Sequence, residues 1–197
     1  MEQFRLFIRH MLKRIDWFLA ALVVLSASFG LILISSATAT FGTKKLLIVQ
    51  AGGILLGLLM CLVLLTLEHE NLARFSVPIY ILCVLLLIFT LIFGKEVMGN
   101  KNWIELGPIN IQPSEFVKIG FILTFAKHLS KVRTYINHPQ ALLPLAAHFL
   151  IIAVLVALEG DLGTTLVFAF ICLAMLMAAG LHWGYFLGGA VVVGGAA

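Results

Sequence analysis

Charged residues are scarce in this sequence: aspartate, glutamate, lysine and arginine together make up 11% of its 197 residues. Soluble domains carry about 25% of these residues and about 45–50% apolar ones, whereas hydrophobic residues reach 62% here. No soluble fold of this size hides that much apolar surface from water, so lipid must cover much of it. The composition therefore excludes a soluble domain.

Cysteine is also rare, with three residues, Cys61, Cys83 and Cys172, all inside apolar runs. Their spacing fits neither a disulfide framework nor a metal site. The net charge of +4 comes from basic residues divided among short segments between apolar runs. They form no patch with interleaved aromatic residues, which argues against a nucleic-acid partner. Basic flanks of membrane helices are the expected explanation, with membrane lipids as the surroundings.

Long apolar runs dominate what is present. The first one follows a basic segment, so a signal peptide is an alternative, and Ala37-Thr38-Ala39 offers a small-residue cleavage site. The run is longer than the roughly 7–15 residues of a signal peptide core, and further runs follow, which favours a retained helix. Most runs approach the roughly 20 residues that a membrane-spanning helix needs. The predicted spans are 17–35, 46–67, 77–94, 114–129, 141–158, 162–181 and 183–197.

These runs predict one all-α integral membrane domain over residues 1–197, a polytopic bundle of six complete spans and a truncated seventh. A β-barrel is disfavoured because the runs are too long and do not alternate polar with apolar residues. The last run stops at Gly194-Gly195-Ala196-Ala197 without a polar flank. We therefore expect the chain to be the N-terminal part of a longer protein.

Lysine and arginine predict the orientation. A cytoplasmic N-terminus places eight basic residues in inner segments and four in outer ones, which agrees with the positive-inside rule. The inner residues are Arg5, Arg9, Lys13, Arg14, Arg74, Lys127, Lys131 and Arg133, and the outer residues are Lys44, Lys45, Lys95 and Lys101. Lys118 is not counted because it lies within a span. The chain is therefore predicted to be a multi-pass protein of a cell membrane.

Polar residues near the outer ends of the spans are the candidates for function. Gln112, Pro113 and Ser114 suit the start of the fourth helix. Glu115 falls in its first turn, where a negative charge favours the helix dipole. Lys118 lies three residues later on the same face and can pair with Glu115. An ion pair that only fixes helix packing is as plausible as a functional pair, because charges in membranes serve both roles.

Two more segments place polar residues on the predicted outer side. Lys101 could meet a phosphate as a point charge, although a solvated lysine is the commoner case, and Trp103 suits an interfacial anchor. Asp161 can cap the sixth helix ahead of Thr164, while Glu159 and Asp161 together could bind a divalent cation or act in acid–base chemistry. His148 lies inside the fifth span, where hydrogen bonding between helices is commoner than proton relay.

Together these segments resemble the SEDS family (shape, elongation, division and sporulation), which includes RodA, FtsW and SpoVE. The family's outer loop reads Gly-x-x-Arg-Trp, its fourth helix starts Gln-Pro-Ser-Glu with a lysine three residues on, and its sixth follows Gln-Pro-Asp-Leu-Gly-Thr. The chain departs from these patterns with Asn102 in place of arginine and Glu159-Gly160 in place of Gln-Pro. The matching segments are 15–17, 35–38, 99–103, 112–118, 126–127 and 161–164. The opening Ile15-Asp16-Trp17 favours the RodA branch over the FtsW branch.

The resemblance implies the first part of a ten-span fold in the bacterial cytoplasmic membrane. It implies a glycosyltransferase that polymerises lipid II into peptidoglycan for cell elongation or division, together with a class B penicillin-binding protein. Undecaprenyl-linked glycan would be its product. The family's catalytic aspartate lies in an outer loop beyond Ala197, with Glu115 and Lys118 as a pair that supports the site. Substrate-binding candidates are Lys101, Trp103, Gln112, Ser114, Asp161 and Thr164. The resemblance identifies no certain cofactor, and a divalent cation is possible.

Two other functions are compatible with the sequence. A transporter or flippase for the lipid-linked precursor is one, but transporters usually place polar residues near the bilayer midplane, and here they gather at the outer ends. A non-catalytic scaffold for cell division or cell shape, which binds partners through its lipid-facing helices, is the other.

The 197-residue chain by itself is expected not to polymerise lipid II, because the catalytic aspartate that the resemblance implies is not part of it. A gel assay for glycan strands with the purified chain, its partner and lipid II measures this. Glycan synthesis by the 197-residue chain would contradict the expectation.

Overall fold

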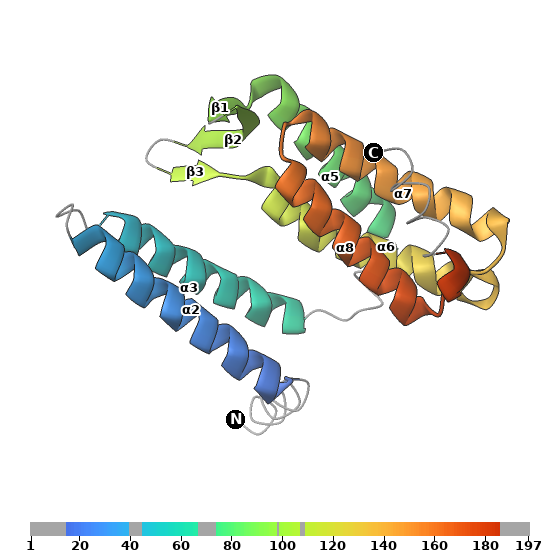
Figure 1. The fold of residues 1–197 in the computed structure, drawn as a ribbon, viewed down its shortest axis with the longest axis horizontal. Helices are drawn as coiled ribbons and strands as arrows, with labels where there is room; N and C mark the ends of the chain where they lie inside the picture. Colours follow the sequence, from blue (N-terminus) through green and yellow to red (C-terminus); the bar gives the residue numbers. More distant parts are fainter. Residues whose placement is uncertain (1–14, 40–44, 67–73, 98, 107–108, 186–197) are drawn as a thin grey trace. The chain divides into compact units, whose positions relative to one another are not determined.

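The computed structural model describes residues 15–39, 45–66, 74–97, 99–106 and 109–185 (Figure 1). These residues divide into two compact units, one up to His69 and one from Glu70. The first unit contains α2 (Trp17–Thr38) and α3 (Lys45–Thr66). The second contains α5 (Ser76–Phe93), β1 (Lys95–Val97), β2 (Asn100–Leu106), β3 (Ile109–Ile111), α6 (Pro113–Val132), the short 3₁₀ helix η2 (Arg133–Tyr135), α7 (Pro139–Leu158) and α8 (Leu162–Ala179).

The helical membrane bundle is confirmed. Six helices cover the first six predicted spans, with ends that differ from the predicted ones by at most three residues. Five of the described helices are long and apolar enough to cross a membrane: α2, α3, α5, α7 and α8. The seventh predicted span, 183–197, lies outside the described residues from 186 onwards, so it stays a prediction, as does the cytoplasmic N-terminus.

The helix α6 differs from the other spans. It carries four charged side chains, at Glu115, Lys118, Lys127 and Lys131, and is not among the five apolar helices. It also buries more residues than any other described helix, because it packs against α5, α7 and α8. Burial among protein helices explains how a span of this polarity is accommodated, since polar residues at membrane depth usually face the bundle interior.

The segment between α5 and α6 adds a small sheet to the helical bundle. It forms a three-stranded antiparallel sheet in the order β1-β2-β3, in place of the loop that the apolar runs suggested. Ile104 pairs with Ile111 across β2 and β3, and the Lys95 ammonium lies 2.6 Å from the Glu105 carboxylate. The strands are only three to seven residues long, and such short apolar segments carry no periodicity that separates them from loops. In Figure 1 the sheet lies at one end of the second unit.

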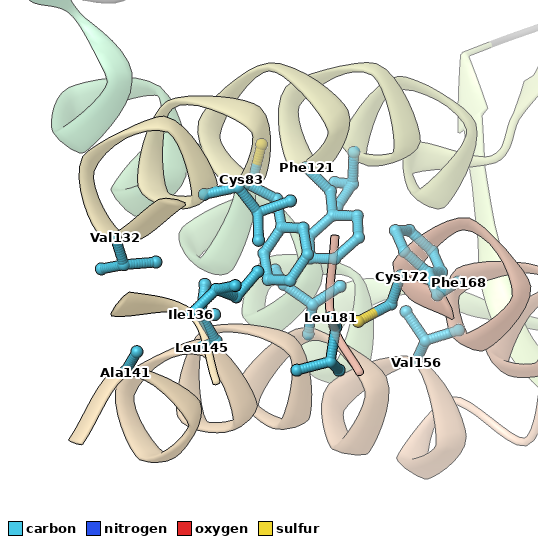
Figure 2. Packing of buried hydrophobic residues seen from close by; sticks show 14 of the residues in the cluster. Cys83, Phe121, Val132, Ile136, Ala141, Leu145, Val156, Phe168, Cys172 and Leu181 are labelled. Carbon is cyan, nitrogen blue, oxygen red and sulfur yellow. The ribbon is translucent and has the colours of Figure 1, made fainter. Parts of the chain in front are cut away.

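Aromatic side chains of α6 and α8 form the centre of the second unit (Figure 2). Phe121, Phe125 and Phe168 are fully buried. The ring of Phe121 stacks on Phe125 with centroids 5.0 Å apart and meets Phe168 edge-on at 5.6 Å. Such pairs contribute about 0.5–1.5 kcal/mol each beyond their buried area. This cluster fixes α6 and α8 against each other, and with them the side chains at their outer ends.

The helices α5 and α6 approach closely at Gly120. A Cβ atom added at Gly120 would overlap the Sγ atom of Cys83, which is itself buried. A glycine and a small thiol thus face each other where larger side chains would push the helices apart. Cys83 and Cys172 are both buried, whereas Cys61 is exposed.

Substitution of this glycine should therefore destabilise the bundle. We expect Gly120→Ala to lower the free energy of unfolding by about 1–3 kcal/mol through overpacking, and Cys83→Ala to restore most of the loss because it removes the overlapping sulfur. Thermal unfolding in detergent, followed by tryptophan fluorescence, measures both. Gly30→Ala in α2, where no atom lies within 4 Å of the added Cβ, is the control and should be neutral or stabilising. If Gly120→Ala and Gly30→Ala changed the free energy of unfolding equally, the packing explanation would be contradicted.

Candidate functional site

The carboxylate of Asp161 is the centre of a polar cluster at the sheet end of the second unit. Its Oδ2 atom accepts hydrogen bonds from Asn102 Nδ2 at 2.7 Å, Gln112 Nε2 at 2.8 Å and the hydroxyl of Thr164 at 2.8 Å. Its Oδ1 atom accepts a fourth from the backbone N–H of Thr164, also at 2.8 Å. Asn102, Gln112, Asp161 and Thr164 are called the Asp161 cluster below.

Local sequence places each member of the cluster at the end of an element. Asp161 is the N-cap of α8, where its side chain meets the free N–H of Thr164. Gln112 is the N-cap residue of α6, and Pro113 follows it at the first helical position, which proline favours. Asn102 lies in β2. One carboxylate therefore joins the starts of two helices to a strand, and the capping role predicted for Asp161 is confirmed.

The turn between α7 and α8 also contacts β2 through its backbone. The N–H of Lys101 donates to the carbonyl of Glu159 at 2.7 Å. Gly160 has φ +85°, and a Cβ atom there would lie 3.1 Å from both Asn100 Oδ1 and Gly99 O. Proline cannot adopt this φ, so the turn differs in backbone shape from the Gln-Pro turn of the SEDS pattern. Glycine therefore lets Gly99 and Asn100 approach the turn between α7 and α8 closely.

Glu159 is buried beside this cluster with 2% of its surface exposed. Neither carboxyl oxygen has a hydrogen-bond partner among the described residues. Burial, and next the negative charge of Asp161, raise the pKa of Glu159 to about 8. Glu159 is therefore mostly a neutral carboxylic acid at pH 7.

Asp161 has the opposite tendency. Burial by itself raises the pKa of Asp161, but the hydrogen bonds from Thr164, Asn102 and Gln112 outweigh burial, and the pKa ends below its ordinary value. Two neighbouring carboxyl groups thus carry different charges, since hydrogen bonds stabilise one anion and burial disfavours the other. Such a separation of pKa values is common where acids divide proton-donating and charge-stabilising roles.

Two further buried polar atoms lie on Asn102, a member of the cluster, and on Ser114, which lies two residues after Gln112. Asn102 Oδ1 and the hydroxyl of Ser114 have no partner among the described residues, although both side chains are at most 3% exposed. Unpaired buried polar groups are rare and costly, so they mark places where a water, an ion or a substrate group completes the structure. Among the described residues no three histidine, cysteine or acidic side chains gather into a metal site.

Glu115 and Lys118 form the predicted ion pair. The Lys118 ammonium lies 2.7 Å from the Glu115 carboxylate, and the side chains are 22% and 54% exposed respectively. Both lie within two turns of Gln112, so the pair is at the same end of α6 as the Asp161 cluster. Among the described residues the pair has no hydrogen bond to that cluster. The structure thus leaves Glu115 accessible to a polar partner.

The two loop candidates lie in the sheet. Lys101 is half-buried in β2, and its ammonium donates to the carbonyl of Ile92 at 3.2 Å, in the last turn of α5. That contact holds the lysine at a helix C-terminus, which attracts positive charge. Trp103, in the same strand, is half-buried opposite Lys95. Neither side chain bonds to the Asp161 cluster among the described residues.

Asn102 is a candidate site residue that the sequence did not identify as such, and Glu159 was considered only together with Asp161. Both also depart from the SEDS pattern, on segments 57 residues apart in the numbering. The structure brings the two segments together, because Asn102 binds Asp161 while Lys101 binds Glu159. Asn102 replaces a charged arginine of the SEDS pattern, and Glu159 replaces a neutral glutamine. These paired changes of charge were the one sign in the sequence that the two segments are neighbours.

Comparisons with known proteins show the family of this chain. A sequence model of the FtsW/RodA/SpoVE family, described as cell cycle proteins, matches residues 15–197. A relative from Bacillus subtilis, named probable peptidoglycan glycosyltransferase FtsW, is 31% identical over 95% of the chain and 49% of its own length. One from Hydrogenovibrio crunogenus with the same name is 31% identical over 87% of the chain and 46% of its own length. The chain thus spans about half the length of these relatives.

Solved structures give the same fold. The rod shape determining protein RodA of Thermus thermophilus is 32% identical, with a TM-score of 0.76 over 92% of the chain and 59% of that protein. A chain from a peptidoglycan synthase complex is 30% identical, with a TM-score of 0.79 over 92% of the chain and 52% of the other. Relatives named FtsW and a structure named RodA both match, so the preference for the RodA branch stays a prediction.

The buried acid predicts a pH dependence of stability. A carboxyl with a higher pKa in the folded than in the unfolded protein stabilises the fold fully below pH 4.5 and loses this effect as the pH rises to about 8. In this window the free energy of unfolding of wild type should therefore fall by up to about 1.4 kcal/mol per pH unit relative to that of Glu159→Gln. Thermal unfolding at pH 5 to 9 measures the difference.

The control for this pH series is Glu96→Gln, which changes an exposed glutamate of β1. It should follow the wild-type pH profile. Parallel profiles of wild type and Glu159→Gln would show that Glu159 does not carry a raised pKa.

Proposed function

Because this chain belongs to the FtsW/RodA/SpoVE family, we propose that it is part of a peptidoglycan glycosyltransferase that polymerises lipid II into glycan strands. The observation that carries the proposal is the 31% identity, over most of the chain, to relatives that bear the name probable peptidoglycan glycosyltransferase. The multi-pass helical bundle suits a substrate with a lipid anchor, since such a substrate stays in the membrane while its sugars extend into water.

The proposed reaction is glycosyl transfer. A sugar hydroxyl of one lipid II attacks the anomeric carbon of the growing strand and forms a new C–O bond. The bond from that carbon to undecaprenyl diphosphate breaks, and the diphosphate leaves with the electron pair. A general base takes the hydroxyl proton, while cations or basic side chains stabilise the leaving diphosphate. The base is expected outside these 197 residues, in the later loop that the family resemblance implies.

Glu115 and Lys118 are proposed to support this site from the start of α6. The pair is exposed enough to meet a polar substrate, with the carboxylate more than half accessible. An exposed ion pair contributes only about 0–1 kcal/mol to stability, so packing alone gives little reason for two charges at the end of a membrane helix. Lys118 is also the kind of cation that a developing diphosphate charge attracts.

The Asp161 cluster is proposed to position the pair. Asp161 uses both carboxylate oxygens for internal hydrogen bonds, so it is better suited to hold the helix starts than to take a proton. Through Gln112 it fixes the first turn of α6, from which Glu115 and Lys118 extend. Ser114 and Asn102 keep unpaired oxygens nearby for substrate hydroxyls or water.

The proposed partner is a class B penicillin-binding protein, and the proposed location of the site is the outer face of the membrane. The structural match to a chain from a peptidoglycan synthase complex supports a partner of this kind. The clustering of polar residues at the sheet end, which the predicted orientation places outside, supports the location. It also favours an enzyme over a transporter with a site at the bilayer midplane.

The test uses the full-length protein that contains this segment, purified with its penicillin-binding partner and supplied with lipid II. We expect Glu115→Ala and Lys118→Ala each to reduce glycan synthesis at least tenfold, as loss of a charge that stabilises the transition state commonly does, while thermal stability changes little. The matched control is Lys95→Ala, which breaks the exposed pair with Glu105 at the same end of the unit. It should keep near wild-type activity.

Several outcomes are informative. Equal glycan synthesis by wild type and all variants would assign the Glu115–Lys118 pair to packing alone. If Lys95→Ala reduced glycan synthesis as much as Glu115→Ala and Lys118→Ala, the loss would be a general effect of charge at this end of the unit. If wild type makes no glycan but moves lipid II across vesicle membranes, the transporter function replaces the enzyme, and absence of both would favour the scaffold.

A further inference from the structure

A second polar site lies at the end of the same unit that is farthest from the sheet. It is a cavity of about 240 Å³ between the first turns of α5, the last turns of α6 and the middle of α7. A water molecule occupies about 30 Å³ in the liquid, so the cavity has room for a phosphate group and several waters. None of the residues in the proposed glycosyltransferase site lines it.

Two lysines give this cavity its charge. Lys127 and Lys131 lie one turn apart on α6, and both line the cavity. No carboxylate is among the lining residues, and neither lysine forms an ion pair with any described residue. Like charges four residues apart on a helix destabilise it by a few tenths of a kcal/mol. A bound anion would convert this repulsion into attraction.

A chain of hydrogen bonds occupies the other polar groups of the wall. The hydroxyl of Thr124 donates to the carbonyl of Phe121, so it accepts from His148 Nε2, which lies 3.2 Å away. His148 Nδ1 then accepts from His128 Nδ1, also at 3.2 Å. Tyr80 donates its hydroxyl to the carbonyl of His148 at 2.9 Å. This assignment of the ring protons follows from the network, and it confirms the predicted role of His148 in bonding between helices.

The network leaves donors, and few acceptors, toward the cavity. The two lysine ammonium groups and the hydroxyl of Ser76 have no acceptor among the described residues. Ser76 is also the first residue of α5, whose N-cap position, Phe75, offers no capping side chain. Helix N-termini attract anions through their free N–H groups and dipole. The start of α5 and the lysines of α6 therefore direct positive potential into one cavity.

We propose that this cavity binds the phosphate group of an anionic phospholipid. The shared chemistry with free phosphate is the tetrahedral anion, but the location favours a lipid. Ser76 and Lys131 lie at helix ends, at the level of lipid headgroups, and the outward faces of α5 and α7 beside them are apolar and exposed. The predicted orientation places this end on the cytoplasmic side, where basic pockets between helices bind anionic headgroups.

The site is independent of glycosyl transfer, so its test does not depend on the proposed function. The full protein, extracted in detergent, is incubated with phosphatidylglycerol or phosphatidylcholine, and retained lipid is counted by native mass spectrometry. We expect wild type to retain one phosphatidylglycerol in preference to phosphatidylcholine. The double variant Lys127→Gln/Lys131→Gln should lose roughly thirtyfold in affinity for phosphatidylglycerol, given the usual contribution of each lysine near a lipid surface.

The matched control removes two positive charges outside the cavity. Arg74→Gln/Arg133→Gln changes exposed basic residues next to the start of α5 and the end of α6 that do not line it, and its affinity should stay within about threefold of wild type. The double variant Lys127→Arg/Lys131→Arg keeps the charge and should keep the lipid, which separates loss of binding from loss of folding.

Three results would overturn the proposal. If Lys127→Gln/Lys131→Gln and Arg74→Gln/Arg133→Gln lose equal affinity for phosphatidylglycerol, the effect is one of general surface charge and not of the cavity. If wild type does not prefer phosphatidylglycerol to phosphatidylcholine, the cavity is not a site for an anionic phospholipid. If millimolar inorganic phosphate raises the thermal stability as much as phosphatidylglycerol does, the cavity is a site for free phosphate and not for a lipid.

Discussion

The hydrogen bonds to Asp161 hold the sheet end of the second unit together. A carboxylate in this position is tolerated because it accepts four of them, from two helix starts and a strand. If the anion were removed, Asn102 and Gln112 would each lose a charged acceptor, and such bonds are worth about 1.5–3 kcal/mol each. The sheet is also anchored by the Lys101–Glu159 backbone bond, so the position of β2 depends on the same turn.

The second unit separates two kinds of polar chemistry along its helices. The sheet end holds the buried Glu159, the half-buried Asp161 and a carboxylate–ammonium pair, whereas two lysines and two histidines surround a cavity toward the other end. The aromatic cluster of Phe121, Phe125 and Phe168 lies between them and contains no charge. This arrangement follows from the cost of charge near the bilayer centre. It also lets one rigid helix, α6, present different ligands at its two ends.

Much of the helical architecture could be predicted from the sequence. The lengths of the apolar runs, together with Pro113 at the start of the fourth one, located six helices within three residues of their ends. The pairing of Glu115 with Lys118 and the capping by Asp161 followed from spacings of three residues. The sheet could not be predicted in this way, because β1 and β3 are too short to show alternation and are held by their neighbours.

The sequence by itself determined that the chain is a membrane bundle, which residues lie in its helices and which motifs relate it to SEDS proteins. These properties depend on the length of apolar runs and on contacts within one helical turn, which the order of residues specifies directly. Only the tertiary structure decided that Asn102 and Gln112 bind Asp161, that Glu159 is buried as a neutral acid and that Lys127, Lys131 and His148 surround one cavity. Those residues come from segments up to 59 positions apart. Their proximity, and the pKa of Glu159 that depends on it, arise from how the helices pack and not from any local pattern.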